Sequence, residues 1–225
     1  MEMIAVRAVS AINAKIVLKV FSRWKGSFCL TLLCLFVFGC GTTTGERVRA
    51  SVNAPAPDVA LFSHCSAYGC QIVQQTAFAD EEWQKIMDIF DPLPASAEEE
   101  RLKLSEAIGL MEQFVGPKTS TNKDKAKSWL FTFMPTGQLD CIDEAINTTT
   151  YLELLKGADL IKYHTIGSIA LRGGGMGFRM LHNTATLTER NSDKSFALDS
   201  WFRANGVNAD VVPLNEWLDG WSPSG

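Results

Sequence analysis

The chain has 225 residues, of which 21 are basic and 25 acidic, giving a formal net charge of −4. Hydrophobic residues make up 46% of it, with six tryptophans and thirteen phenylalanines, which suits one domain with a substantial core. Because an acidic balance repels polyanions, we expect no nucleic-acid partner.

Residues 1–39 have the features of a leader and export signal. Arg23 and Lys25 precede an apolar run of 12 residues from Ser27 to Phe38. That run is too short for a transmembrane helix, which needs about 20 residues. The remaining 186 residues hold 16 basic and 24 acidic side chains, a net charge of −8. Membrane attachment must therefore come from a lipid rather than from a basic patch.

The four residues 37–40, Val-Phe-Gly-Cys, resemble the lipobox of bacterial lipoproteins. There the signal is cut before the cysteine, and the cysteine carries the lipid. The resemblance implies that Cys40 is the lipidated N-terminus of a bacterial cell-envelope protein. Gly41, where some lipoproteins have aspartate, resembles an address for the outer membrane, facing the periplasm. An ordinary signal peptide with a coincidental cysteine is the alternative.

Export predicts a disulfide, because an exported domain meets an oxidising compartment. Three thiols remain after the signal and Cys40 are set aside: Cys65, Cys70 and Cys141. Pairing Cys65 with Cys70 across a short loop leaves Cys141 free, and a bridge from either one to Cys141 is the alternative. His64 beside Cys65 lacks a further ligand, so we expect no metal and no cofactor.

Residues 40–58 are Thr-, Ala- and Pro-rich and are expected to form a flexible tether to a domain over 59–225. A first helix is predicted from Asp80 to Phe90. Ser96 with Glu99 forms a capping box that begins a second helix. Its apolar stripe indicates core packing, and Gly116-Pro117 is expected to end it; the stripe consists of Leu104, Ile108, Met111 and Val115.

A central helix is predicted from Cys141 to about Lys156, because Asp140 is a favourable N-cap and Gly157 a favourable stop. Its apolar residues lie on more than one side, so it should pack against a sheet. Before it, residues 128–135 are aromatic-rich and are expected to form a strand or buried segment.

After Gly157 the pattern has a period of two residues, which predicts strands within 160–171, 178–188 and 195–202. Residues 172–177 are glycine-rich. No lysine and Ser/Thr follow them as in a phosphate-binding loop, so we expect a hairpin connection that can rim a substrate cleft. The Trp-containing tail, residues 211–221, is expected to pack back on the sheet.

Cys141, His182 and Asp199 together suggest nucleophilic catalysis. A cysteine at the start of a helix feels the partial positive charge of the unpaired amides, which favours the thiolate. His182 would supply the remaining stabilisation, so we expect the pKa of Cys141 to lie below the usual value of about 8.5.

The spacing between His182 and Asp199 also fits a hairpin. If the loop of this hairpin has an even number of residues, the sequence numbers of any two residues that face each other across it add up to an odd number. The side chains of His182 and Asp199 then lie on the same face of the hairpin. With Asn191-Ser192 at the centre of the turn, His182 is opposite Trp201 and Asp199 is its diagonal neighbour.

Three short motifs resemble those of the transglutaminase-like cysteine-peptidase superfamily. They are Asp140-Cys141-Ile142-Asp143 at the start of a helix, His182-Asn183-Thr184-Ala185 at the start of a strand, and Leu198-Asp199-Ser200-Trp201 on the next strand. The likeness covers residues 100 to 205. It implies an α+β, papain/transglutaminase-like fold with N-terminal helices and a central cysteine-bearing helix on an antiparallel sheet. Two departures, Ile142 and Asn183-Thr184, leave the substrate class open.

The resemblance further implies a role for each residue. Cys141 would attack an amide or acyl carbonyl, His182 would take and return the proton, and Asp199 would orient the imidazole. The backbone N–H of Cys141 would face the oxyanion, with Gln138 as a candidate side-chain donor, although Gln138 also suits a surface turn. His164 is a competing base, but no acid follows it on an adjoining strand.

We therefore expect a lipid-anchored cysteine hydrolase or acyltransferase of the cell envelope. Its substrates would be peptide, isopeptide or related amide bonds, and a peptide or envelope protein would be its partner. The alternative is a non-catalytic domain of the same fold that serves as a binding or scaffolding lipoprotein.

Overall fold

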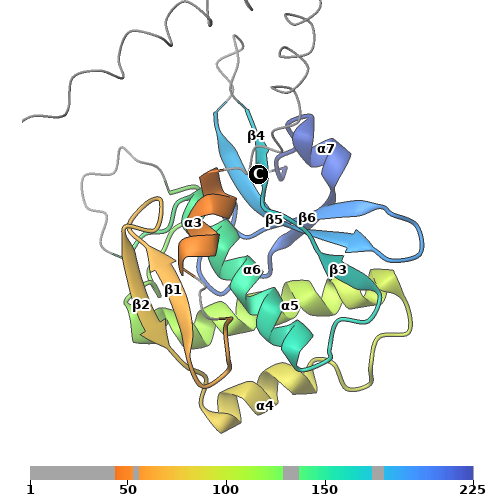
Figure 1. Ribbon diagram of the computed structural model, residues 1–225, viewed down its shortest axis with the longest axis horizontal. Coiled ribbons are helices and arrows are strands. Elements are labelled where there is room, and N and C mark those ends of the chain that lie inside the picture. Colours follow the sequence, from red (N-terminus) through yellow and green to blue (C-terminus); the bar gives the residue numbers. More distant parts are fainter. Residues whose placement is uncertain (1–43, 53–55, 129–136, 174–179, 225) are drawn as a thin grey trace, which may run out of the picture. The chain divides into compact units, whose positions relative to one another are not determined.

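The computed structural model describes residues 44–52, 56–128, 137–173 and 180–224, which form an α+β structure of helices and antiparallel sheets (Figure 1). The mixed α+β class predicted from the sequence is thus confirmed. The helices are α3 (Thr44–Val52), α4 (Asp80–Asp88), α5 (Ala97–Thr119), α6 (Cys141–Gly157) and α7 (Leu214–Leu218). The strands are β1 (Phe62–Ser66), β2 (Ile72–Thr76), β3 (His164–Ile166), β4 (Ala170–Arg172), β5 (His182–Glu189), β6 (Ser195–Asp199) and β7 (Asp210–Pro213).

The larger sheet has the order β3-β5-β6-β7, with β4 also paired to β5, and all of its pairs are antiparallel. In the β5–β6 hairpin Ala185 is opposite Leu198, and the N–H of Glu189 donates to the carbonyl of Lys194 at 2.8 Å. The paired residue numbers therefore sum to an odd value, as predicted. This register places His182 and Asp199 on the same face of the hairpin.

Helix α6 packs between this sheet and α5 (Figure 1). Its cap is the predicted one, because Asp140 accepts from the N–H groups of Ile142 at 3.0 Å and Asp143 at 2.9 Å. The predicted stripe of α5 is also confirmed, since all four of its residues are fully buried in the main core. The cysteine-bearing helix is therefore fixed between two layers.

Helix α5 does not end at Gly116-Pro117 as predicted. It continues to Thr119 and stops at Ser120, whose φ of 64° is left-handed. Pro117 removes only one N–H donor in the last turn, and the carbonyl of Gly116 accepts from Thr121 at 2.9 Å. The closing turn thus tolerates the proline.

Part of the predicted tether is folded. Within residues 40–58, α3 forms a helix that contacts α6. Arg49 Nη1 lies 2.7 Å from Glu153 Oε1, and Glu46 Oε2 accepts from the N–H of Ile169 at 3.2 Å. These polar contacts hold α3 against the domain, although its low apolar content had led us to expect a flexible tether.

A second sheet, the β1–β2 hairpin, was not predicted from the sequence. Strand β1 is buried throughout, whereas the side chains of β2 are mostly exposed, so neither strand shows a clear alternation along its length. Helix α6 contacts β1 and thereby connects the hairpin to the core.

Several sequence-based expectations fall outside the described residues. They are the leader and signal over 1–39, lipidation of Cys40, the aromatic segment after Ser128 and most of the glycine-rich connection. Within the described part of the chain, no helix combines the length and apolar character needed to cross a membrane.

Candidate active site

The three predicted catalytic residues stand at the ends of secondary-structure elements. Cys141 is the first residue of α6, His182 the first of β5 and Asp199 the last of β6. His182 and Asp199 are buried, whereas Cys141 is partly exposed. Strand pairing and helix packing therefore hold the imidazole and the carboxylate, while Cys141 keeps part of its surface exposed.

His182 and Asp199 form a direct pair, with 2.6 Å between His182 Nε2 and Asp199 Oδ2. An ionised carboxylate only accepts hydrogen bonds, so Nε2 carries the proton in this pair. In the neutral ring Nδ1 is then an acceptor. It is buried and has no hydrogen-bond partner among the described residues. In the His182–Asp199 pair, Nδ1 is thus a proton acceptor that no described residue uses.

The indole of Trp217 completes the environment of the carboxylate. Its Nε1 donates to Asp199 Oδ2 at 2.7 Å, and its ring centroid lies 5.3 Å from that of His182. Trp201 and Phe202 also pack on the imidazole, with centroid distances of 4.6 and 5.3 Å. Three aromatic rings therefore fix the histidine and shield its bond to Asp199 from water.

The thiol of Cys141 lies against the backbone on both sides of His182. Its Sγ is 3.9 Å from the carbonyl oxygen of Leu181, and Asn183 Nδ2 approaches the sulfur at 3.8 Å. No hydrogen bond joins the sulfur to the His182 ring among the residues that the structure describes. Asn183, which sequence reasoning treated only as a departure from the motif, is thus a neighbour of the candidate nucleophile.

Burial raises the pKa of the Cys141 thiol to about 11. Hydrogen bonds from the backbone and side chain of Asn183 lower this pKa, but the charges of Asp140 and Asp199 raise it. The expected thiolate with a pKa below the usual value is therefore wrong for this structure. A raised pKa favours the neutral thiol at Cys141, so a base would have to remove its proton before the sulfur could act as a nucleophile.

Gln138 has a structural role in this conformation. Its Oε1 accepts from Ser128 Oγ at 2.7 Å, and its Nε2 donates to the carbonyl oxygens of Lys123 at 3.0 Å and Gly137 at 3.3 Å. Because the side-chain amide closes the loop before α6, the surface-turn alternative accounts for it, and the oxyanion role stays a prediction. The N–H of Cys141 is not one of the two that Asp140 caps.

A disulfide loop supports the start of α6. Cys65 and Cys70 are joined, and Cys141 is a free thiol, as the first of the two pairing alternatives predicts. Asp143 accepts from the N–H groups of Tyr68 at 2.8 Å and Cys70 at 2.5 Å, and from that of Asp140 at 3.1 Å. The loop therefore bonds to the helical turn that carries Cys141.

The other two histidines have structural partners. His164 Nδ1 lies 2.7 Å from Glu100 Oε1, and its Nε2 lies 3.1 Å from Arg101 Nη1. His64 is buried between the hydroxyls of Thr121 and Tyr151, and burial lowers its pKa to about 3. Neither forms an acid–base pair with Cys141. No cluster of three or more metal-ligating side chains occurs among the described residues.

Buried carboxyl groups occur close in the chain to two of the candidate residues. Glu144 Oε2 accepts from Ser200 Oγ at 2.6 Å, beside Asp199 in the chain, and burial raises the pKa of Glu144 well above its usual range. The charges of Glu112 and Asp124 raise it further. These groups favour their protonated forms, so they can donate hydrogen bonds inside the protein.

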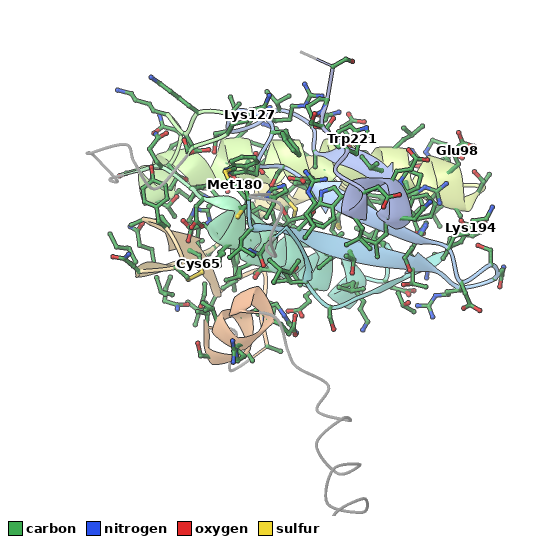
Figure 2. All side chains as sticks on the ribbon, turned by 90° about the horizontal axis from the view of Figure 1, so that it is seen from above. Cys65, Glu98, Lys127, Met180, Lys194 and Trp221 are labelled. Atoms are coloured by element: carbon green, nitrogen blue, oxygen red, sulfur yellow. A yellow bond between two sulfur atoms is a disulfide. The ribbon has the colours of Figure 1, made fainter. Side chains whose placement is uncertain are left out.

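A pocket of about 370 Å³ opens beside His182. Trp201, Phe202, Met180 and Leu218 supply most of its apolar wall, and Lys127 and Arg172 its charge. Lys127 and Met180, two residues of this lining, are labelled in Figure 2. The imidazole of His182 therefore borders a space for a small group.

Comparison with protein-family models, with curated proteins and with solved structures finds no match for this chain.

Proposed function

We propose that the chain is a cysteine hydrolase or acyltransferase with a papain/transglutaminase-like arrangement of Cys141, His182 and Asp199. The observation that supports it most is the unused Nδ1 of a buried His182 whose Nε2 is bonded to Asp199. Such a ring is a base of fixed tautomer, and the neighbouring thiol needs one. The resemblance of the three motifs supports the same assignment.

In the proposed reaction the proton of Cys141 passes to His182 Nδ1 as Sγ bonds to the carbonyl carbon of an amide. The C–N bond then breaks, and the imidazolium returns the proton to the leaving amine. Water or an acceptor amine then attacks the resulting thioester and gives a proton to His182. The C–S bond breaks, and His182 passes that proton to Sγ, which restores the free thiol and the neutral imidazole. Asp199 holds the ring, and it stabilises the positive charge while the proton is on it.

The test is the pH dependence of Cys141 alkylation by iodoacetamide, followed on the peptide that contains Cys141. If His182 is the base, His182→Ala should slow alkylation at about pH 7 by at least about tenfold, because general-base help is worth that much or more. Near the thiol pKa of about 11 the two profiles should converge, since hydroxide then forms the thiolate.

His164→Gln is the matched control, because it alters a buried histidine bonded to Glu100 and should leave the profile unchanged. A stoichiometric burst from p-nitrophenyl acetate with acetyl on Cys141 would add the acyl-enzyme step. Coincident wild-type and His182→Ala profiles would refute the base assignment.

One observation favours the non-catalytic alternative. The sulfur contacts the backbone and Asn183 rather than the imidazole, and its pKa is raised. In that case the domain would be a binding or scaffolding lipoprotein. Such a protein would show neither the burst nor the His182-dependent profile.

We further propose that Cys40 carries the lipid and that the domain faces the periplasm from the outer membrane of a bacterial envelope. The short apolar run and the Gly39-Cys40 pair support this. Globomycin should accumulate the precursor, and Cys40→Ala should change membrane fractionation. Unchanged fractionation in both experiments would exclude the anchor.

A further inference from the structure

The pocket beside His182 is positively charged in a chain of net negative charge. Lys127 and Arg172 are the charged residues of its described lining, and no carboxylate side chain belongs to that lining. The chain as a whole has a net charge of −4. A cationic pocket with low-dielectric walls attracts anionic groups, even though the net negative charge of the whole chain repels them.

Local structure holds Lys127 at this position. Its φ is 59°, a left-handed conformation that is unusual for a residue with a side chain, and its N–H donates to the carbonyl of Trp201 at 2.8 Å. Its Nζ lies 5.7 Å from the centroid of the Phe202 ring. Lys127 takes part in no ion pair within the described residues.

Arg172 provides the second charge. Its guanidinium lies 4.3 Å from the Trp217 ring centroid and 5.9 Å from that of Phe202, and its Nη1 donates to the carbonyl of Trp217. Two cations therefore lie near the Phe202 ring, Lys127 from the loop after α5 and Arg172 from β4. An aromatic wall with cations beside it suits a ligand that combines an apolar group with an anion.

We infer that this pocket binds a carboxylate of the amide substrate, with Lys127 as its counter-ion and Phe202 in contact with the adjoining apolar group. The inference rests on the proposed function, because His182 lines the same pocket. It narrows the substrate to an amide with a carboxylate close to the scissile bond, either a chain terminus or an Asp/Glu side chain. Charge-assisted contacts of this kind supply orientation as well as affinity.

The binding experiment uses the full chain with Cys141→Ala, so that its outcome does not depend on turnover. The probes are 3-phenylpropionate and its neutral amide, titrated while the tryptophan fluorescence is recorded. We expect the acid to bind at least about tenfold more tightly than the amide, with a preference that weakens as salt is added. Lys127→Gln should abolish the preference, and Lys127→Arg should retain it.

Lys125→Gln is the matched control, because Lys125 is exposed, lies two residues away and does not line the pocket. Equal binding of acid and amide, or a preference that survives Lys127→Gln, would overturn the inference. Failure of the proposed function would instead appear in the alkylation profiles, with binding of the acid intact. Peptides with a C-terminal carboxylate or amide, and with Glu or Gln before it, then identify which carboxylate is bound.

Discussion

Glu112 offers a quantitative test of the buried carboxyl groups behind the site. It belongs to α5, and its Oε2 accepts from the N–H of Gly206 at 2.9 Å, while Oε1 is buried without a partner among the described residues. Burial raises the pKa of Glu112 to about 8, the charge of Asp124 raises it too, and the bond from Gly206 lowers it. Glu112→Gln imitates the protonated side chain and should fold normally.

The sign of the pH effect follows from proton linkage. The folded protein keeps the Glu112 proton up to about pH 8, whereas the unfolded chain loses it near the ordinary value of 4.5. Between these values the folded state binds more protons, so the free energy of unfolding falls as the pH rises. From pH 5 to pH 8 the wild type should lose on the order of 3 kcal/mol through this group. Glu112→Gln should lose none of it.

Urea unfolding followed by tryptophan fluorescence at several pH values between 5 and 8 measures this difference. The two proteins should have similar stability at the acidic end, and the variant should be the more stable at the alkaline end. Glu106→Gln on the exposed face of α5 is the control and should follow the wild type. Parallel lines for wild type and Glu112→Gln would refute the raised pKa.

Three further substitutions test the surroundings of the site. Trp217→Phe keeps an aromatic ring but removes the N–H that donates to Asp199, so it should slow Cys141 alkylation at about pH 7 by more than threefold. Trp221→Phe is the control and should leave the rate unchanged, and equal rates for Trp217→Phe and the wild type would contradict a positioning role for Trp217. Asp143→Ala leaves three N–H groups without their acceptor and should cost about 2–4 kcal/mol in urea unfolding, and a loss below 1 kcal/mol would contradict this account. Arg49→Ala removes a half-buried ion pair and should cost less than about 1 kcal/mol by the same measurement, so a larger loss would mean that α3 is essential to folding.

The features that the sequence predicted correctly are those set by near neighbours. The cap at Asp140 and the helix after it depend on residues within one turn, and the hairpin register depends on the length of one loop. These two features bring Cys141 near the backbone of His182 and pair His182 with Asp199. The cap and the hairpin register therefore explain why the His182–Asp199 pair and the start of α6 could be predicted. The contacts of Sγ with Asn183 and with the carbonyl of Leu181 were not predicted.

The features that the sequence did not predict depend on packing between residues that are far apart in the chain. Trp217 follows Asp199 by 18 residues, and its only sequence signal was membership of a Trp-containing tail. The pKa of Cys141 was predicted in the wrong direction, because a helix start is visible in the sequence but the burial of the thiol is not. Asn183 gave no signal beyond its position after the histidine.

Through Trp217, the smallest described helix, α7, contacts Asp199 and helps to hold the His182–Asp199 pair in place. Helix α7 has five residues, so few hydrogen bonds within it resist its release, and its main hold on the sheet is the buried Trp217. Segments of this kind open with a smaller free energy than the whole domain. Heating should therefore release Trp217 and expose the His182–Asp199 bond to water while the sheet and α6 remain folded. The proposed activity would then be lost at a lower temperature than the rest of the fold.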